Sequence, residues 1–338
     1  MAKAQSQANR LIWADVTRII AIVLVVLVHT FPYPTTTTWS AQVSLYIFIC
    51  AKTCVPLFLM LTGALLLSKQ EPTTVFFLKR VRRIIAPWLT WALVIFLITN
   101  RQLLTSPLMA AHSYFGILSS SFTYLPMIIC LYLLIPTFRI VVREVTLSHV
   151  WFLIALWFIA TSLLPFSRNT MAFPLSVDNG LVRQTIQYSG YLFLGWALQR
   201  VVIKGKWLLL VLLGTLLTAL WSMQLVLGET ALQFQYLTYS APLIIISSAG
   251  FFVVLANCES YSGRLPLQVK KAILVLSEVC FGVFLSHPLI VSWLNSSFFT
   301  TSTFSLSGNI FRWLISVAVS FAFIILLSRI KPLKKWIT

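Results

Sequence analysis

Acidic side chains are scarce in this sequence. Seven Asp and Glu residues stand against 25 Lys and Arg in a chain of 338 residues, which gives a net charge of +18. Only 9% of the residues are charged and 59% are hydrophobic, whereas a soluble domain carries about 25% charged residues. A soluble core could not bury this much apolar surface. The composition therefore predicts an integral membrane protein.

Patterns for disulfides and metal ions are also missing. The five cysteines show neither CxxC nor zinc-finger spacing, and four of them lie in apolar runs, where Cys acts as a small buried hydrophobe. The four histidines lie at different predicted depths, so we expect no metal site. The first apolar run is too long for the apolar region of a cleavable signal peptide, and we expect it to remain as a membrane span.

The excess of positive charge does not predict nucleic-acid binding. Lys and Arg occur in short clusters between apolar runs, as in the cytoplasmic loops of membrane proteins. No basic region is interleaved with aromatic residues. These clusters therefore indicate topology, and we expect no nucleic-acid partner.

Apolar runs of nearly 20 residues recur along the chain and predict an all-α polytopic bundle of about ten transmembrane helices. The predicted helices are 11–31, 43–67, 84–100, 114–138, 149–166, 185–200, 207–227, 238–256, 273–293 and 309–328. Most basic residues fall in alternate connections, which by the positive-inside rule face the cytoplasm together with both termini. These residues are Lys3, Arg10, Lys69, Lys79, Arg80, Arg82, Arg83, Arg139, Arg143, Arg200, Lys204, Lys206, Arg264, Lys270, Lys271, Arg329, Lys331, Lys334 and Lys335. We find no internal repeat and expect residues 1–338 to form a single membrane domain.

The first predicted helix carries three ionisable side chains in an otherwise apolar stretch. Asp15 and Arg18 are three residues apart and can pair on one helix face. Arg18 and His29 are eleven residues apart, a rotation of about 1100°, so both project from one face about 16 Å apart along the axis. They could line a passage or hold different parts of an extended ligand. Alternatively, the Asp–Arg pair anchors the helix at the interface and the histidine is structural.

Five short segments, taken in order, resemble membrane-bound acyltransferase family 3. Asp15 and Arg18 followed by His29 resemble its opening R-x10-H motif. The remaining segments are Val55–Phe58 with Gly63, the basic stretch Phe77–Pro87, Tyr191–Gly195 and Phe281–Pro288. Thr62 and Ala64 depart from the usual residues around the glycine of the second segment, and Tyr124–Met127 replaces an HLWF-like stretch. These departures leave the acceptor more open than the reaction type.

The resemblance implies an enzyme that transfers an acyl group, commonly acetyl from acetyl-CoA, to a carbohydrate or lipid-linked sugar outside the bacterial cytoplasmic membrane. Known members modify O-antigens, peptidoglycan, enterobacterial common antigen and exported small molecules. The hydrolase-like domain attached to some members has no counterpart here, so the resemblance is to the stand-alone O-acetyltransferase type. A homo-oligomer is left open. The alternative is a secondary transporter or exporter of a glycan-like or acylated solute, because charges within the membrane fit both functions.

The resemblance also implies roles for individual residues. His29 is expected to act as general base or transient acyl carrier, because a neutral imidazole suits either role near pH 7. Arg18 would orient the donor through its planar guanidinium, and Asp15 would restrain Arg18. The densest basic cluster would bind the CoA phosphates, with ordinary positive-inside topology as the equal alternative. The members of this cluster are Lys79, Arg80, Arg82 and Arg83.

Two further residues are expected at the acceptor site. His287 precedes Pro288 toward the outer end of the ninth predicted helix, and a structural role at the helix end is equally plausible for it. Glu278 lies nine residues earlier in the same helix. It could pair with Lys52, the single lysine within the second predicted span, because opposite charges in a membrane usually find each other.

Overall fold

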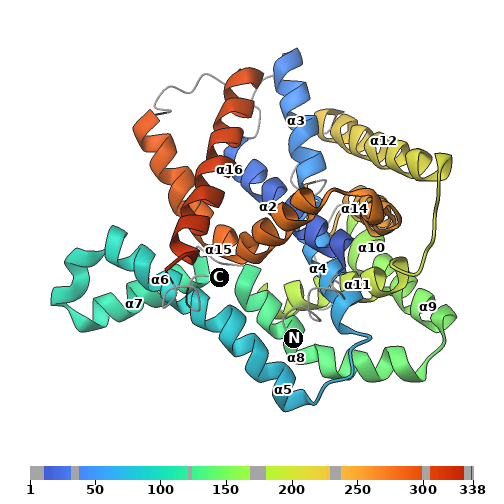
Figure 1. Cartoon of the computed structure of the whole chain (residues 1–338), viewed down its shortest axis with the longest axis horizontal. Coiled ribbons are helices and arrows are strands. Elements are labelled where there is room, and N and C mark those ends of the chain that lie inside the picture. Colours follow the sequence, from blue (N-terminus) through green and yellow to red (C-terminus); the bar gives the residue numbers. More distant parts are fainter. Residues whose placement is uncertain are drawn as a thin grey trace.

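The computed structural model describes residues 11–31, 38–120, 124–167, 180–228, 237–298, 305–330 and 336, and within these ranges the chain is helical with no strand (Figure 1). The prediction of an all-α polytopic membrane protein is confirmed. The principal helices are α2 (Ile12–Thr30), α3 (Trp39–Ala51), α4 (Cys54–Leu66), α5 (Thr73–Arg80), α6 (Ala86–Thr99), α7 (Pro107–Ser120), α8 (Tyr124–Glu144), α9 (Leu147–Phe158), α11 (Gly180–Leu198), α12 (Lys206–Gly228), α14 (Pro242–Asn257), α15 (Leu267–Phe298) and α16 (Leu306–Ser328).

Eight helical segments in the described ranges are long and apolar enough to cross a membrane. They are Ile12–Thr30, Trp39–Leu66, Thr73–Thr99, Tyr124–Glu144, Lys206–Gly228, Pro242–Arg264, Leu267–Phe298 and Leu306–Ser328. The other two predicted spans, 149–166 and 185–200, are also helical, over Leu147–Leu163 and α11. Neither of these two helices is among the eight, and Leu147–Leu163 is shorter than all of them. The number of helices that cross the membrane therefore stays a prediction.

Three predicted helices differ from the observed ones. The expected helix 43–67 is divided at Lys52 and Thr53 into α3 and α4. Pro56 explains the division, because it has no N–H to donate to the carbonyl four residues earlier. The expected helix 114–138 is replaced by α7 and a separate α8. The expected helix 84–100 starts earlier, at Thr73, so the basic stretch is itself helical.

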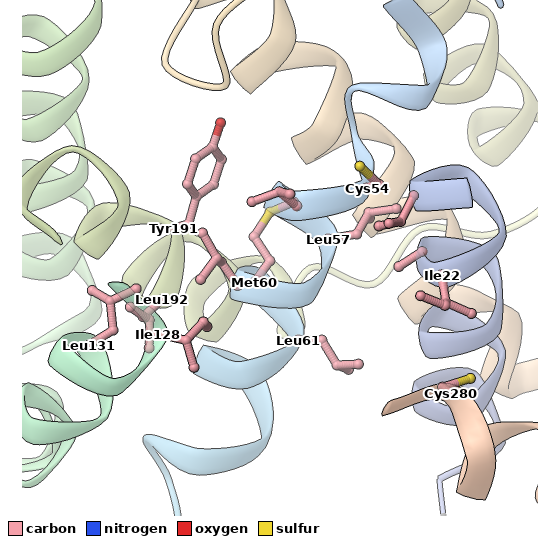
Figure 2. Packing of buried hydrophobic residues seen from close by; sticks show 14 of the residues in the cluster. Ile22, Cys54, Leu57, Met60, Leu61, Ile128, Leu131, Tyr191, Leu192 and Cys280 are labelled. Carbon is pink, nitrogen blue, oxygen red and sulfur yellow. The ribbon is translucent and has the colours of Figure 1, made fainter. Parts of the chain in front are cut away.

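Helix α4 lies at the centre of the core. Figure 2 shows Ile22 of α2 and Cys280 of α15 on one side of α4, and Tyr191 and Leu192 of α11 on the other. The α4 side chains between them, including that of Leu57, are fully buried. In Figure 1, α2 lies next to this centre, and it packs against α15, α16, α3, α4 and α14.

Two glycines allow α4 and α11 to touch through their backbones. A Cβ atom added to Gly63 of α4 would lie 1.9 Å from the backbone oxygen of Leu192. A Cβ atom added to Gly195 of α11 would lie 2.0 Å from the backbone oxygen of Met60. Small residues are typical of close helix contacts in membranes. This contact gives a structural reason for the glycines of the second and fourth resembling segments.

The basic connections lie together at one end of the bundle, which we call the basic end. Hydrogen bonds join these connections, from Arg139 Nε to the Leu66 carbonyl (2.9 Å), from Arg200 Nη2 to Ser68 Oγ (3.3 Å), from the Ile203 N–H to Asn257 Oδ1 (2.8 Å) and from the Trp13 N–H to Glu259 Oε2 (2.7 Å). This grouping agrees with the alternation of basic segments. The predicted cytoplasmic location of the termini concerns residues 1–10 and 331–338, which, apart from Trp336, lie outside the described ranges.

Candidate functional site

Helices α2 and α15 run parallel and contact each other at two levels. Near the basic end, Ser277 Oγ donates a hydrogen bond to Asp15 Oδ1 (2.6 Å). Further along both helices, the rings of His29 and His287 lie 5.0 Å apart between centroids. Residue numbers increase in the same direction on both helices, so the helices are parallel. The face of α2 that carries the charged residues therefore looks toward α15 at both levels.

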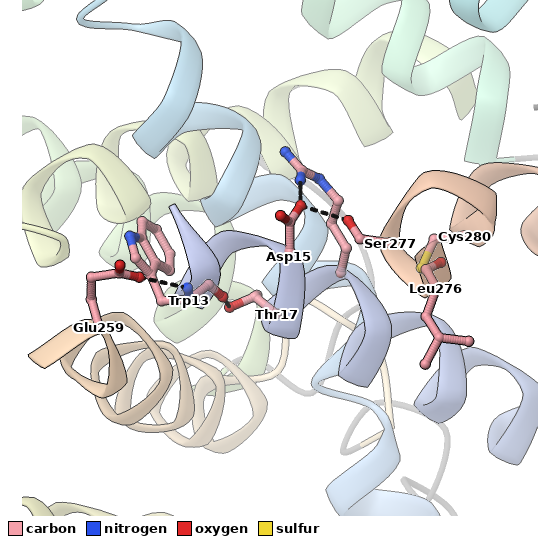
Figure 3. Close-up of polar contacts among 8 residues, drawn as sticks. Trp13, Asp15, Thr17, Glu259, Leu276, Ser277 and Cys280 are labelled. Carbon is pink, nitrogen blue, oxygen red and sulfur yellow. Dashed lines mark hydrogen bonds and ion pairs between the residues drawn. The ribbon is translucent and has the colours of Figure 1, made fainter. Parts of the chain in front are cut away.

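The predicted ion pair between Asp15 and Arg18 is present near the basic end. Arg18 Nη1 lies 2.6 Å from Asp15 Oδ1, the oxygen that also accepts from Ser277. Figure 3 shows Asp15 and Ser277 pointing toward each other from their two helices. The Asp15 side chain is fully buried, whereas that of Arg18 is 33% exposed. The pair and the hydrogen bond offset the cost of burying the carboxylate, and the guanidinium keeps N–H donors for a ligand.

The two histidines differ in their surroundings. The ring of His29 is exposed at the end of α2, and that of His287 is 3% exposed within α15. His287 Nδ1 lies 2.7 Å from the backbone oxygen of Phe284. A carbonyl oxygen only accepts, so Nδ1 carries the proton and the neutral ring has its lone pair on Nε2. This Nε2 is buried, with no hydrogen-bond partner among the described residues.

Pro288 makes this arrangement possible. In a regular helix, the Phe284 carbonyl would accept from the N–H of residue 288. Proline has no N–H, so the carbonyl is open to the ring of His287. The His-Pro sequence therefore fixes the tautomer of the histidine through local geometry alone.

The predicted pair between Glu278 and Lys52 does not form. The Lys52 ammonium lies 5.0 Å from the centre of the Phe48 ring and 4.9 Å from that of the Tyr239 ring. Within the described part of the chain, no carboxylate forms an ion pair with it. Glu278 is exposed and follows the residue that binds Asp15, near the basic end, whereas Lys52 lies at the middle of its own span.

Glu278 also lies away from the other residue expected at the acceptor site. It is nine residues from His287 on the same helix, about 14 Å along the axis. The structure therefore brings His287 to His29 but does not bring Glu278 to either histidine.

The four basic residues expected to bind CoA have different surroundings. Lys79 pairs with Glu71 (2.7 Å). The guanidinium of Arg80 lies over the rings of Phe76 (4.5 Å) and Tyr132 (5.6 Å). The other two members, Arg82 and Arg83, are exposed and lie in the π-helical turn Val81–Ile85. Such turns are frequent at functional sites. The cluster is therefore divided into a neutralised lysine, an arginine packed on two rings and two exposed arginines.

The sequence did not single out Arg139 and Tyr132, which complete the basic end. The Arg139 guanidinium lies 4.6 Å from the Phe76 ring and pairs with Glu71 (3.2 Å). The hydrogen bond from Lys79, followed by that from Arg139, lowers the pKa of Glu71 below its usual value. The Tyr132 ring lies 5.6 Å from the Arg80 guanidinium, and its hydroxyl is also within electrostatic range of Arg18. A tyrosine in an apolar helix carries no distinctive sequence signal, whereas Arg139 was visible only as part of the basic pattern.

The chemistry available at the two levels is different. Imidazole can accept and return a proton or carry an acyl group, and guanidinium groups bind phosphate oxygens in pairs. The described residues contain no group of three or more His, Cys, Asp and Glu side chains placed to hold a metal ion. The arrangement thus offers anion-binding groups at the basic end and a histidine pair farther along α2 and α15.

A family model described as an acyltransferase domain, that of acyltransferase family 3, matches residues 11–329, which is nearly the whole chain. No curated protein and no solved structure gives a significant match. The matched range includes all five resembling segments, together with Arg18, His29 and His287.

Proposed function

Because this chain belongs to acyltransferase family 3 and is a multi-pass membrane acyltransferase, we propose that it is an O-acyltransferase of the bacterial cytoplasmic membrane. It transfers an acyl group, with acetyl as the first candidate, from acyl-CoA to a hydroxyl of an extracytoplasmic or lipid-linked glycan. One observation carries the proposal. Parallel helices hold Arg18 near the basic end and the imidazoles of His29 and His287 farther along, as transfer between an inner donor and an outer acceptor requires.

The donor binds at the basic end in this proposal. Arg80 forms no ion pair with a carboxylate of the described residues, and its packing on two rings holds the guanidinium in place. Arg82 and Arg83 are exposed nearby. Three guanidinium groups within about one turn of helix suit the several phosphate charges of CoA. Arg18 then orients the part of the donor that reaches into the bundle. Like Arg80, it lies within electrostatic range of Tyr132.

The histidine pair performs the transfer. The exposed ring of His29 accepts the proton of the acceptor hydroxyl, whose oxygen forms a bond to the acyl carbon. The carbon–sulfur bond then breaks, and the proton passes from His29 to the departing thiolate. The fixed lone pair on His287 Nε2 stabilises the imidazolium while His29 holds the proton. A transient acyl group on His29 is the alternative route, and trapping of an acyl-enzyme without acceptor would distinguish it.

Acyl transfer by the reconstituted protein tests this function. The protein in lipid nanodiscs receives acetyl-CoA and a lipid-linked glycan extract, and free thiol and acylated glycan are measured. We expect donor-dependent transfer that falls about 10²- to 10⁴-fold in His29→Ala, the usual contribution of a positioned base. His149→Ala is the control, because His149 is exposed and bonded to Thr146 beside the start of α9. Full transfer by His29→Ala would refute the assignment of the base. Solute accumulation in liposomes without any acyl donor would favour a transporter.

A further inference from the structure

Lys52 is a cation at the midpoint of a membrane span. The segment Trp39–Leu66 has 28 residues, and Lys52 stands near its centre, about 20 Å from either end at 1.5 Å per residue. Its side chain is only partly buried. It also marks the break between α3 and α4 that Pro56 imposes. A lysine near the end of a helix can extend its ammonium to the headgroups, but from the centre the side chain is too short.

The surroundings of this ammonium leave its hydrogen-bond donors available. Its contacts are the faces of the Phe48 and Tyr239 rings, at 5.0 and 4.9 Å. Aromatic faces attract a cation but do not replace the hydrogen bonds that an ammonium makes in water. None of the described residues accepts a hydrogen bond from Lys52 Nζ. A charged group that is held within a membrane without a counter-ion is typical of a functional site.

The aromatic ring that faces Lys52 from the far part of the chain is held firmly. The backbone oxygen of Tyr239 accepts a hydrogen bond from the Tyr191 hydroxyl (2.6 Å), and Tyr191 is fully buried. The next carbonyl, that of Ser240, accepts from Ser162 Oγ (2.6 Å). The phenol oxygen of Tyr239 lies 3.9 Å from Cys54 Sγ. The segment that carries this ring is therefore held in place before any ligand binds, and an environment organised in advance is the condition for electrostatic catalysis.

Lys52 is also an electrostatic neighbour of His29, one member of the histidine pair. Phe48, which contacts its ammonium, belongs to the same buried cluster as Leu27 of α2 and Phe31, the residue that follows α2. These two residues lie on either side of His29 in the sequence. Lys52 lies within electrostatic range of the His29 ring. His287 approaches His29 from α15, whereas Lys52 comes from the connection between α3 and α4. The proton-accepting group thus has a second imidazole on α15 and a cation in the connection between α3 and α4.

We propose that the Lys52 ammonium stabilises the oxyanion formed during acyl transfer, an inference that rests on the proposed function. When the acceptor oxygen bonds to the acyl carbon, the carbonyl electrons move to the carbonyl oxygen and the hydroxyl proton moves to His29. Lys52 stays protonated and donates N–H groups to this oxyanion. The carbonyl then re-forms, the carbon–sulfur bond breaks, and His29 returns the proton to the thiolate. Nothing besides acyl-CoA and the acceptor is consumed.

Steady-state kinetics of Lys52→Met in nanodiscs test the inference with acetyl-CoA and the glycan extract. Removal of one oxyanion donor typically lowers kcat about 10²- to 10³-fold. We expect such a loss with KM values for donor and acceptor unchanged, and partial recovery of kcat in Lys52→Arg. The control is Lys206→Met, because Lys206 also lies against an aromatic ring, that of Trp207 (5.7 Å), but at the exposed basic end. If Lys52→Met cannot be purified, Lys52→Gln keeps N–H donors without the charge, and a smaller loss of kcat with unchanged KM values is expected.

The outcomes separate this inference from the proposed function. A wild-type kcat in Lys52→Met overturns the oxyanion role while leaving the acyltransferase intact. A raised acceptor KM with unchanged kcat also overturns it, and assigns Lys52 to an anionic group of the acceptor instead. A wild-type protein that transfers no acyl group overturns the proposed function, and this inference with it.

Discussion

The exposed ring of His29 on α2 lies 5.0 Å from the buried ring of His287 on α15, with the two planes inclined by 54°. The buried ring has its proton on the nitrogen that faces Phe284 and its lone pair on the other nitrogen. A reactive base in proteins is often supported by a second group with a defined protonation state. Here the supporting group is a second imidazole whose tautomer is set by its own helix.

Substitution of His287 by Asn distinguishes the roles of its two ring nitrogens. The Asn amide can still donate to the Phe284 carbonyl, but nothing replaces the lone pair of Nε2. We expect folding and acetyl-CoA binding to be retained and kcat to fall about 10- to 100-fold, as when a group that supports a functional histidine is removed. His112→Asn is the control, since His112 is exposed on α7. An unchanged kcat in His287→Asn would restrict His287 to a structural role.

Pro288→Ala tests how the tautomer is fixed. Alanine restores an N–H that competes with His287 for the Phe284 carbonyl, so we expect a mixture of the two neutral tautomers and a lower kcat. Nitrogen NMR of protein labelled at histidine measures the tautomer ratio directly. Pro136→Ala is a matched control, because Pro136 also lies inside a helix, α8, but does not follow a histidine. A single unchanged tautomer in Pro288→Ala would show that other contacts orient the ring.

The double substitution Arg80→Gln and Arg83→Gln tests the proposed CoA site. We expect the KM for acetyl-CoA to rise, and its dependence on salt to become weaker than in the wild type, because fewer charge pairs remain to be screened. Measurement of KM between low and high ionic strength gives both effects. Arg143→Gln should leave KM unchanged, since Arg143 pairs with Glu144 on the exposed surface. Equal KM values in the double variant and the wild type would show that both arginines contribute only to membrane topology and do not bind CoA.

Gly195→Ala tests the backbone contact between α4 and α11. The new Cβ would lie 2.0 Å from the Met60 carbonyl oxygen, so the helices must separate. Overpacking of this kind costs about 1–3 kcal/mol or more, and we expect a lower melting temperature in detergent. Gly214→Ala on α12 has nothing within 4 Å of the added atom and should be neutral or stabilising, because Ala favours helix over Gly. Equal melting temperatures for Gly195→Ala and the wild type would contradict the observed packing.

Local sequence patterns were enough for the helical fold and for the pairing of Asp15 with Arg18. Hydropathy detects apolar runs, and a separation of three residues on a helix places two charges together whatever the tertiary structure. The break at Lys52 was missed because the run 43–67 is apolar on both sides of this residue, although Pro56 was a visible signal. The separate α7 was missed because nothing in its composition distinguishes it from α8, the helix that follows.

Contacts between helices could not be predicted from one sequence. Lys52 was expected to meet Glu278 because both are isolated charges, but the two lie at different depths and on different helices. The positions of His29 and His287 were each predicted near the outer side, and only the packing of α2 on α15 brings the rings together. Tyr239 reaches Lys52 because hydrogen bonds from Tyr191 and Ser162 hold its loop. No periodicity in the loop itself encodes that position.

Glu71 predicts a pH dependence of stability at the basic end. Its side chain is 9% exposed and pairs with Lys79 and Arg139, which lowers its pKa below the usual 4.5. A lowered folded pKa contributes stability that is complete above the unfolded pKa and is lost as the pH falls through the folded pKa. At pH 7 we therefore expect Glu71→Gln to have a free energy of unfolding about 1–3 kcal/mol below that of the wild type, because bonds to charged groups are lost. The variant should accordingly unfold at a lower temperature. This difference from the wild type should shrink below pH 4.5, as the wild-type carboxyl gains its proton.

Glu144→Gln is the matched control, because Glu144 pairs with Arg143 but is 62% exposed, and exposed pairs contribute little. Melting curves of the three proteins between pH 3 and 8 measure the effect, and a difference that stayed constant across this range would show that the ion pairs of Glu71 do not stabilise the fold.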